Sequence, residues 1–120
     1  MTPPRRLVVP LKEQYFRAFQ RGTKTWELRA VGPMFNPERV QTGRLVLLMR
    51  AYTKDQLEGT IGRIETSTDY RKLSGDALQG LELWHPGWGP KESTTLVSAV
   101  VSPGTPAIAF ECLNLHQPPA

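Results

Sequence analysis

Three charged side chains stand close together in the N-terminal quarter of this 120-residue chain: Lys24, Glu27 and Arg29. An arginine can hold a phosphate or a carboxylate through two parallel hydrogen bonds, and a lysine adds a point charge. A glutamate can orient the lysine or transfer a proton, and a lysine taken out of water can act as a base or nucleophile. If they converge, the three form an anion site, with Lys24 and Glu27 as catalytic candidates. The structural alternative is a salt bridge that holds the strand to a neighbour.

The spacing of these residues sets a condition on their convergence. The sequence predicts a strand from Thr23 to Ala30, in which successive side chains point to opposite faces. Trp26 then faces the core, while Glu27 and Arg29 share the other face. A regular strand would place Lys24 with Trp26. Lys24 therefore meets the other two only if it lies in the turn before the strand, or if the strand is bulged.

The same segment resembles the signature of the ASCH domain, a branch of the PUA-like fold. That signature is Gly-x-Lys-x-x-x-x-Arg, usually with Glu two residues before the Arg, and this chain has Gly22, Lys24, Glu27 and Arg29. The preceding residues 15–19 resemble the aromatic helix of the family. The resemblance implies a strand-rich α+β domain, a small PUA-like mixed β-barrel of five to six strands with one or two short helices. It also implies a basic cleft around this segment that binds RNA or a nucleotide-like anion, in translation or RNA metabolism.

The resemblance carries an enzymatic alternative. Some bacterial ASCH proteins are amidohydrolases that remove an acyl group from a modified cytidine, using a lysine, a threonine and a glutamate, and others are reported as ribonucleases. Lys24 matches the lysine. The threonine stands three residues after it in that set, where this chain has Glu27, while Thr25 is adjacent and would point the other way. A hydrolase acting on modified cytidine or RNA is therefore the alternative to a binding domain. A third reading is an interaction module whose cleft takes a peptide carboxylate.

A second group of candidates follows the predicted central strand. Arg50 and Tyr52 lie two residues apart at its end and share a face, and Lys54 follows in the loop. A basic track with an interleaved ring suits single-stranded nucleic acid, because rings stack on bases while cations hold the backbone. These three residues are therefore candidate nucleic-acid contacts. A solvated surface is the alternative, which we prefer for Arg63 in the next strand.

Aromatic residues also gather in a loop rich in proline and glycine, where Trp84, His85 and Trp88 occur together. One interpretation is a lid or stacking platform over the cleft, which makes Trp88 a candidate ligand contact. The alternative is that the tryptophans close one end of a small barrel. Histidines at 85 and 116 are too few for a metal site, so we expect neither a metal nor a cofactor.

Composition and charge bound the class of protein. The chain is 39% hydrophobic and 22% charged, which is typical of a folded domain rather than a disordered one. Residues 1–72 carry 14 of the 15 lysines and arginines and seven of the 11 acidic residues, a formal charge of +7 that can attract a polyanion. No apolar run is long enough for a membrane span or a secretory signal, so we expect a cytoplasmic protein. The single cysteine, Cys112, is expected to be a buried core residue.

The pattern of apolar residues and turn residues predicts one domain over residues 1–120, with frayed ends at 1–4 and 117–120. The expected elements are a strand at 6–9 ended by Pro10, a helix at 11–21 ended by Gly22, strands at 23–30, 44–51 and 57–67, a short helix at 76–83, and a closing hairpin of 93–101 with 107–115. The helix is expected to bury Leu11, Tyr15, Ala18 and Phe19. Gly59 and Gly62 predict a bulge or barrel bend in the strand at 57–67.

Overall fold

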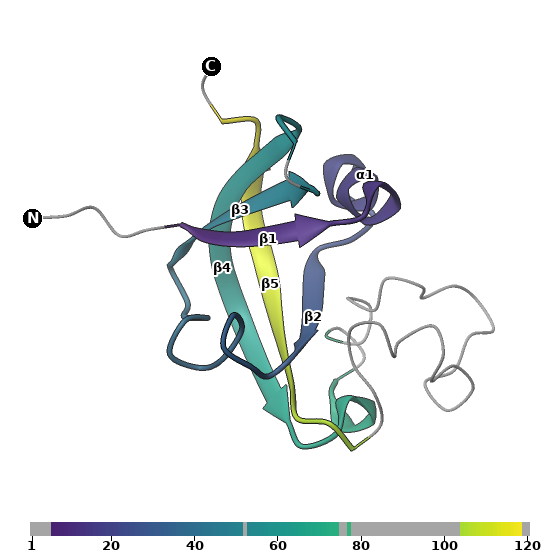
Figure 1. The fold of residues 1–120 in the computed structure, drawn as a ribbon, viewed down its shortest axis with the longest axis vertical. Coiled ribbons are helices and arrows are strands. Elements are labelled where there is room, and N and C mark those ends of the chain that lie inside the picture. Colours follow the sequence, from purple (N-terminus) through teal and green to yellow (C-terminus); the bar gives the residue numbers. More distant parts are fainter. Residues whose placement is uncertain (1–5, 52, 75–76, 78–103, 119–120) are drawn as a thin grey trace, which may run out of the picture.

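A computed structural model describes residues 6–51, 53–74, 77 and 104–118, and these residues form a strand-rich α+β fold (Figure 1). Their five strands make one curled sheet in the order β1-β3-β4-β5-β2. The strands are β1 Leu7–Leu11, β2 Trp26–Ala30, β3 Leu45–Arg50, β4 Gln56–Ser67 and β5 Ala107–His116. The helix α1, Glu13–Arg21, connects β1 to β2, and a short 3-10 helix, η1 Tyr70–Lys72, follows β4. Only β1 and β3 pair in parallel, and the other neighbouring strands are antiparallel. The curled sheet forms a half-barrel with β1 and β2 at its edges.

The predicted first helix is confirmed, although it begins at Glu13 rather than at residue 11. Its inward face buries Tyr15, Phe16 and Phe19, so the predicted burial of Ala18 is wrong and Phe16 is buried instead. Gly22 ends the helix in the left-handed conformation at φ 78°, as predicted, and its amide donates to carbonyl groups of the last turn. This left-handed ending turns the chain back toward the sheet, directly before the charged segment.

The prediction that Pro10 ends the first strand is wrong, because β1 continues to Leu11. Proline lacks an N–H donor, so it fits a strand only where that donor is not needed. Here β1 is an edge strand, and the carbonyl of Leu11 accepts from Ala51 on the β3 side. Backbone groups alternate in direction, so those of Pro10 face away from β3. The edge position therefore tolerates the proline.

The other predicted strands agree with the described strands in place, but β5 pairs with β4 on one side and with β2 on the other, so the predicted hairpin of 107–115 with 93–101 is wrong. The predicted strands at 44–51, 57–67 and 107–115 correspond to β3, β4 and β5 within one residue at each end. The strand predicted at 23–30 begins later, at Trp26, because Thr23 and Lys24 still donate to the carbonyl of Ala18 in the helix. The chain turns directly before β3, with Gly43 at φ 90°.

The bulge predicted in β4 is present, and two register shifts interrupt its pairing with β5. A Cβ atom added at Gly59 would collide with the backbone carbonyl of Leu113 on β5, so the two strands approach closely there. We expect Gly59→Ala to lower the free energy of unfolding by about 1–3 kcal/mol, because the backbone must shift. Gly32→Ala is the matched control, since nothing lies within 4 Å of its added Cβ. Urea unfolding of both variants measures the difference, and equal stabilities would contradict the close approach.

The sheet buries apolar side chains on both of its faces. The main cluster joins α1, β1 and the 31–44 loop to the sheet through residues that include Phe16, Phe19, Phe35, Val46 and Phe110. A second cluster on the opposite face contains Trp26, Leu28, Tyr70, Leu73, Ala77, Ala107 and Ala109. The alternation along β2 thus places Trp26 in an apolar cluster, as predicted, but it also turns the charged face of β2 toward the larger core.

Several predicted features lie outside the described residues. These are Tyr52, the aromatic residues Trp84, His85 and Trp88, the helix at 76–83 apart from Ala77, the strand at 93–101, and the N-terminal residues 1–4. In the part of the chain that the structure describes, no helix has the length and apolar character needed to cross a membrane.

Candidate functional site

Lys24, Glu27 and Arg29 converge, and we call them the charged triad. Lys24 lies in the connection between α1 and β2 and not in the strand, which releases it from the strand alternation. Its Nζ atom is 3.5 Å from Oε1 of Glu27. Arg29 is two residues further along the same face, and its Nη2 atom is 2.8 Å from Oε2 of Glu27. The turn after the helix is therefore what brings the three charges together.

Glu27 is the centre of the triad and is fully buried, with no solvent-exposed surface. Its Oε2 atom accepts from both Nε and Nη2 of Arg29, at 3.0 and 2.8 Å. Its Oε1 atom accepts from the backbone N–H of Leu28 at 3.2 Å and faces the lysine. A carboxylate can remain in an apolar core only with this degree of compensation. The two cations also rest on aromatic rings, Lys24 on Phe19 and Arg29 on Phe35.

Arg29 connects the two edges of the curled sheet. Its Nη2 atom donates to the carbonyl oxygen of Pro10 on β1 at 2.7 Å, although Arg29 itself belongs to β2. The Nε and Nη2 atoms are thus fully engaged by Glu27 and Pro10. The Nη1 atom forms no hydrogen bond with any residue that the structure describes. With 17% of its side chain exposed, Arg29 retains one guanidinium nitrogen for an external partner.

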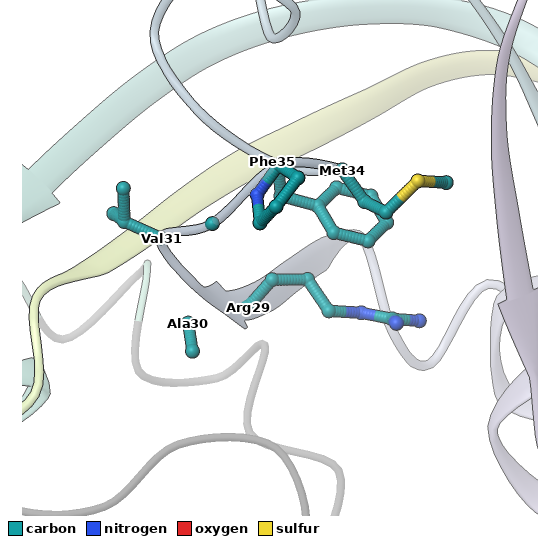
Figure 2. Close-up of a pocket in the computed structure, with 7 residues that line it drawn as sticks. Arg29, Ala30, Val31, Met34 and Phe35 are labelled. Carbon is teal, nitrogen blue, oxygen red and sulfur yellow. The ribbon is translucent and has the colours of Figure 1, made fainter.

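A pocket of about 340 Å³ begins at Arg29 and follows the chain to Phe35, and we call it the Arg29 pocket (Figure 2). Figure 2 shows the Arg29 side chain alongside the Phe35 ring, with the thioether of Met34 extending in the same direction. The guanidinium carbon is 4.8 Å from the ring centre, and Phe35 is itself stacked on Phe110 of the core. Met34 and Val31, which also line the pocket, expose 53% and 38% of their surface.

The triad and the pocket meet only at Arg29. Neither Lys24 nor Glu27 lines the Arg29 pocket, and Lys24 is only 6% exposed. The geometry therefore matches the structural alternative, a salt bridge that holds the strand to a neighbour. Arg29 of β2 pairs with Glu27 and also donates to Pro10 of β1. Of the three charged side chains, only Arg29 lines this pocket, where it lies beside apolar residues.

In the second group of sequence candidates, Arg50 forms a surface ion pair, Lys54 is exposed, and Tyr52 lies outside the described residues. Arg50, the last residue of β3, donates through Nε to Asp55 at 2.8 Å, and Arg17 of α1 reaches the same carboxylate at 3.4 Å. The hydrogen bond from Arg50 lowers the pKa of the Asp55 carboxyl. Arg63 is held by Glu111 and lies over the Trp26 ring, which agrees with a surface role. Lys54 is exposed and lines a second pocket between α1 and β4.

Sequence reasoning missed the residues that shape the Arg29 pocket, which are Val31, Met34 and Phe35, and it missed the Pro10 carbonyl. One signal was present, because the adjacent apolar residues Met34 and Phe35 follow a Gly-Pro turn, where polar residues are usual. Cys112 was predicted as a core residue and is confirmed as one, since it is 4% exposed and burial raises the pKa of its thiol.

Known proteins offer no match from which the role of this site could be inferred. Neither a scan against protein-family models nor searches of curated proteins and solved structures found a match to the chain. In the described residues, histidine, cysteine, aspartate and glutamate side chains do not gather in groups of three or more that could hold a metal ion.

Proposed function

We propose that the chain is a PUA-like binding module of the ASCH type that takes single-stranded RNA or a nucleotide-like anion at the Arg29 pocket. The observation that carries this proposal is the way in which the three nitrogens of the Arg29 guanidinium are used. Glu27 and Pro10 hold two of its nitrogens in place, the third has no hydrogen-bond partner among the residues that the structure describes, and the side chain lines a pocket. An arginine whose orientation is already fixed loses little entropy when it binds an anionic oxygen.

The composition of the pocket supports a ligand that combines a negative charge with an apolar, flat part. Arg29 supplies the positive end, and the exposed side chains of Val31 and Met34 supply an apolar wall. A nucleotide has both features, a phosphate and a base that can lie against apolar side chains. The excess of lysine and arginine in residues 1–72 would also raise the rate of encounter with a polyanion.

Substitution of Met34 tests the pocket without disturbing the buried triad, because Met34 is half exposed. We expect Met34→Glu to weaken binding of a short single-stranded RNA at low salt by about tenfold, since it places a negative charge beside the anion site. Met34→Lys should strengthen binding. Fluorescence anisotropy of a labelled RNA at several salt concentrations measures both effects.

Leu113→Glu is the matched control, because Leu113 is a similarly exposed apolar residue, 41%, that does not line the pocket. Its affinity for RNA should be close to that of the unaltered chain. Equal weakening by both glutamate variants would show that only the overall charge matters. Absence of RNA binding at low salt would reject the proposal altogether.

The enzymatic alternative receives no specific support from the described residues, because Lys24 lines no part of the Arg29 pocket and Glu27 is fully enclosed. Incubation of the protein with acylated cytidine nucleosides and short RNAs examines it directly. Turnover that disappears in Lys24→Ala would replace the binding proposal with a hydrolase.

A further inference from the structure

A second pocket, of about 210 Å³, is lined by residues of α1, of the start of β4 and the turn before it, and of the segment after β5. We call it the polar pocket, and its lining residues are Phe16, Gln20, Lys54, Asp55, Gln56, Gln117 and Pro118. Its size is below the range of about 300–1,000 Å³ that is usual for drug-sized ligands, so it suits a smaller molecule. Its walls are mostly polar, which sets it apart from the Arg29 pocket.

The polar pocket presents side chains whose hydrogen-bonding groups are still available. Lys54 and the side-chain amides of Gln56 and Gln117 make no hydrogen bond or ion pair with the residues that the structure describes. Gln20 uses its carbonyl oxygen to accept from Arg17 at 3.0 Å, which leaves its NH₂ group for a ligand. The pocket thus offers one ammonium group and three amides, and each amide can donate to a hydroxyl or phosphate oxygen.

The charges around the polar pocket favour an anion. Asp55 is the only carboxylate in the lining, and two arginines already hold it, Arg50 at 2.8 Å and Arg17 at 3.4 Å. Glu13 lies 3.7 Å from Arg17 on the outer side of the helix. Three cations, including Lys54, therefore stand against two carboxylates in this part of the described structure. The arginine pairs neutralise Asp55, so Lys54 can attract a negative group.

We propose that the polar pocket binds a phosphorylated sugar, with the phosphate on Lys54 and the hydroxyl groups on the amides of Gln20, Gln56 and Gln117. An ammonium group beside several amides complements a ligand that is anionic at one end and rich in hydroxyls at the other. A free sugar phosphate and the ribose-phosphate backbone of RNA share this chemistry. The proposal is independent of the proposed function, because it involves none of the residues that line the Arg29 pocket.

Titration with ribose 5-phosphate, followed by NMR chemical shifts, tests the proposal on the full chain. We expect Lys54→Met to weaken binding by about tenfold and Gln117→Ala by about threefold, as for the loss of one charged and one neutral hydrogen bond. Lys72→Met is the matched control, because Lys72 is also exposed but belongs to η1, at the opposite end of the molecule in Figure 1. The control and Met34→Glu should bind as the unaltered chain does.

Two further arms separate the sources of the ligand. Inorganic phosphate should bind at least tenfold more weakly than ribose 5-phosphate if the amides recognise the hydroxyls. A short RNA that competes with ribose 5-phosphate, while DNA of the same sequence does not, would assign the pocket to an RNA backbone. Competition by neither would assign it to a free sugar phosphate. Equal binding of phosphate and ribose 5-phosphate, or equal weakening by Lys54→Met and Lys72→Met, would overturn the proposal.

Discussion

Replacing Glu27 by glutamine is expected to lower the free energy of unfolding by about 3–5 kcal/mol, because it removes the buried carboxylate that Lys24 and Arg29 share. The side chain is fully enclosed and lies 2.8 Å from Arg29 and 3.5 Å from Lys24, so water cannot compensate for the lost charge. Urea unfolding followed by tryptophan fluorescence gives the difference. Glu58→Gln is the control, since the pair of Glu58 with Arg6 is solvent-exposed and should contribute at most about 1 kcal/mol.

A triple variant separates the structural role of the triad from a role in binding. Replacing Lys24 by methionine, Glu27 by leucine and Arg29 by methionine together should recover most of the stability lost in Glu27→Gln, because apolar side chains of similar size replace a buried ion network well. If Arg29 also binds the anion, this folded variant should not bind RNA. A triple variant that binds RNA with unchanged affinity would leave the triad with a structural role only. Similar stabilities of Glu27→Gln and Glu58→Gln would contradict the burial of the charge.

Phe110→Ala is expected to cost about 3–5 kcal/mol of stability, because this side chain is fully buried in the main cluster at the centre of β5. Its ring is stacked on Phe35 at 6.2 Å, so the cavity would also loosen the loop that carries the Arg29 pocket. The substitution should therefore weaken RNA binding as well as folding. Val46 is a core residue with no ring to stack on Phe35, so Val46→Ala should destabilise the fold while leaving the affinity of the folded protein unchanged.

Cys112 gives a second measurement of the same effect. It is the single cysteine of the chain and is buried in the same cluster, and burial raises the pKa of its thiol, so reagents reach it mainly when the structure opens. A loss of 3–5 kcal/mol in Phe110→Ala should speed its labelling under native conditions roughly 10²- to 10³-fold. Labelling as fast as in unaltered protein would show that Phe110 is not part of a cooperative core.

The sequence predicts the described elements well where local signals are strong. The helix face with Tyr15 and Phe19, the left-handed Gly22 and the bulge at Gly59 follow from short-range patterns of apolar residues and glycine. It misplaces the end of the first strand, because Pro10 reads as a breaker unless the strand is known to lie at a sheet edge. Strand order is a long-range property that residue patterns do not encode directly.

The candidate site is predicted only in part for the same reason. The types and spacing of Lys24, Glu27 and Arg29 raise the question of convergence, which depends on where the helix ends and the strand begins. The partners Pro10 and Phe35 come from elsewhere in the chain, and only the folded sheet brings them to Arg29. The pairing of Arg50 with Asp55 likewise depends on the tight turn after β3, where Ala51 has a φ of 53°.

The hydrogen bonds of the triad have a consequence for self-association. In the part of the chain that the structure describes, β1 and β2 are the outer strands of the sheet, and an outer strand can offer unpaired backbone groups to a strand of a second molecule. In β1, Pro10 has no N–H and its carbonyl oxygen is occupied by Arg29, while in β2 the N–H of Leu28 is capped by Glu27. Arg29 and Glu27 thus each occupy one backbone group on an outer strand, which is then no longer available for pairing. Variants that lose Glu27 or Arg29 would expose these groups, and aggregation by strand addition would accompany their loss of stability.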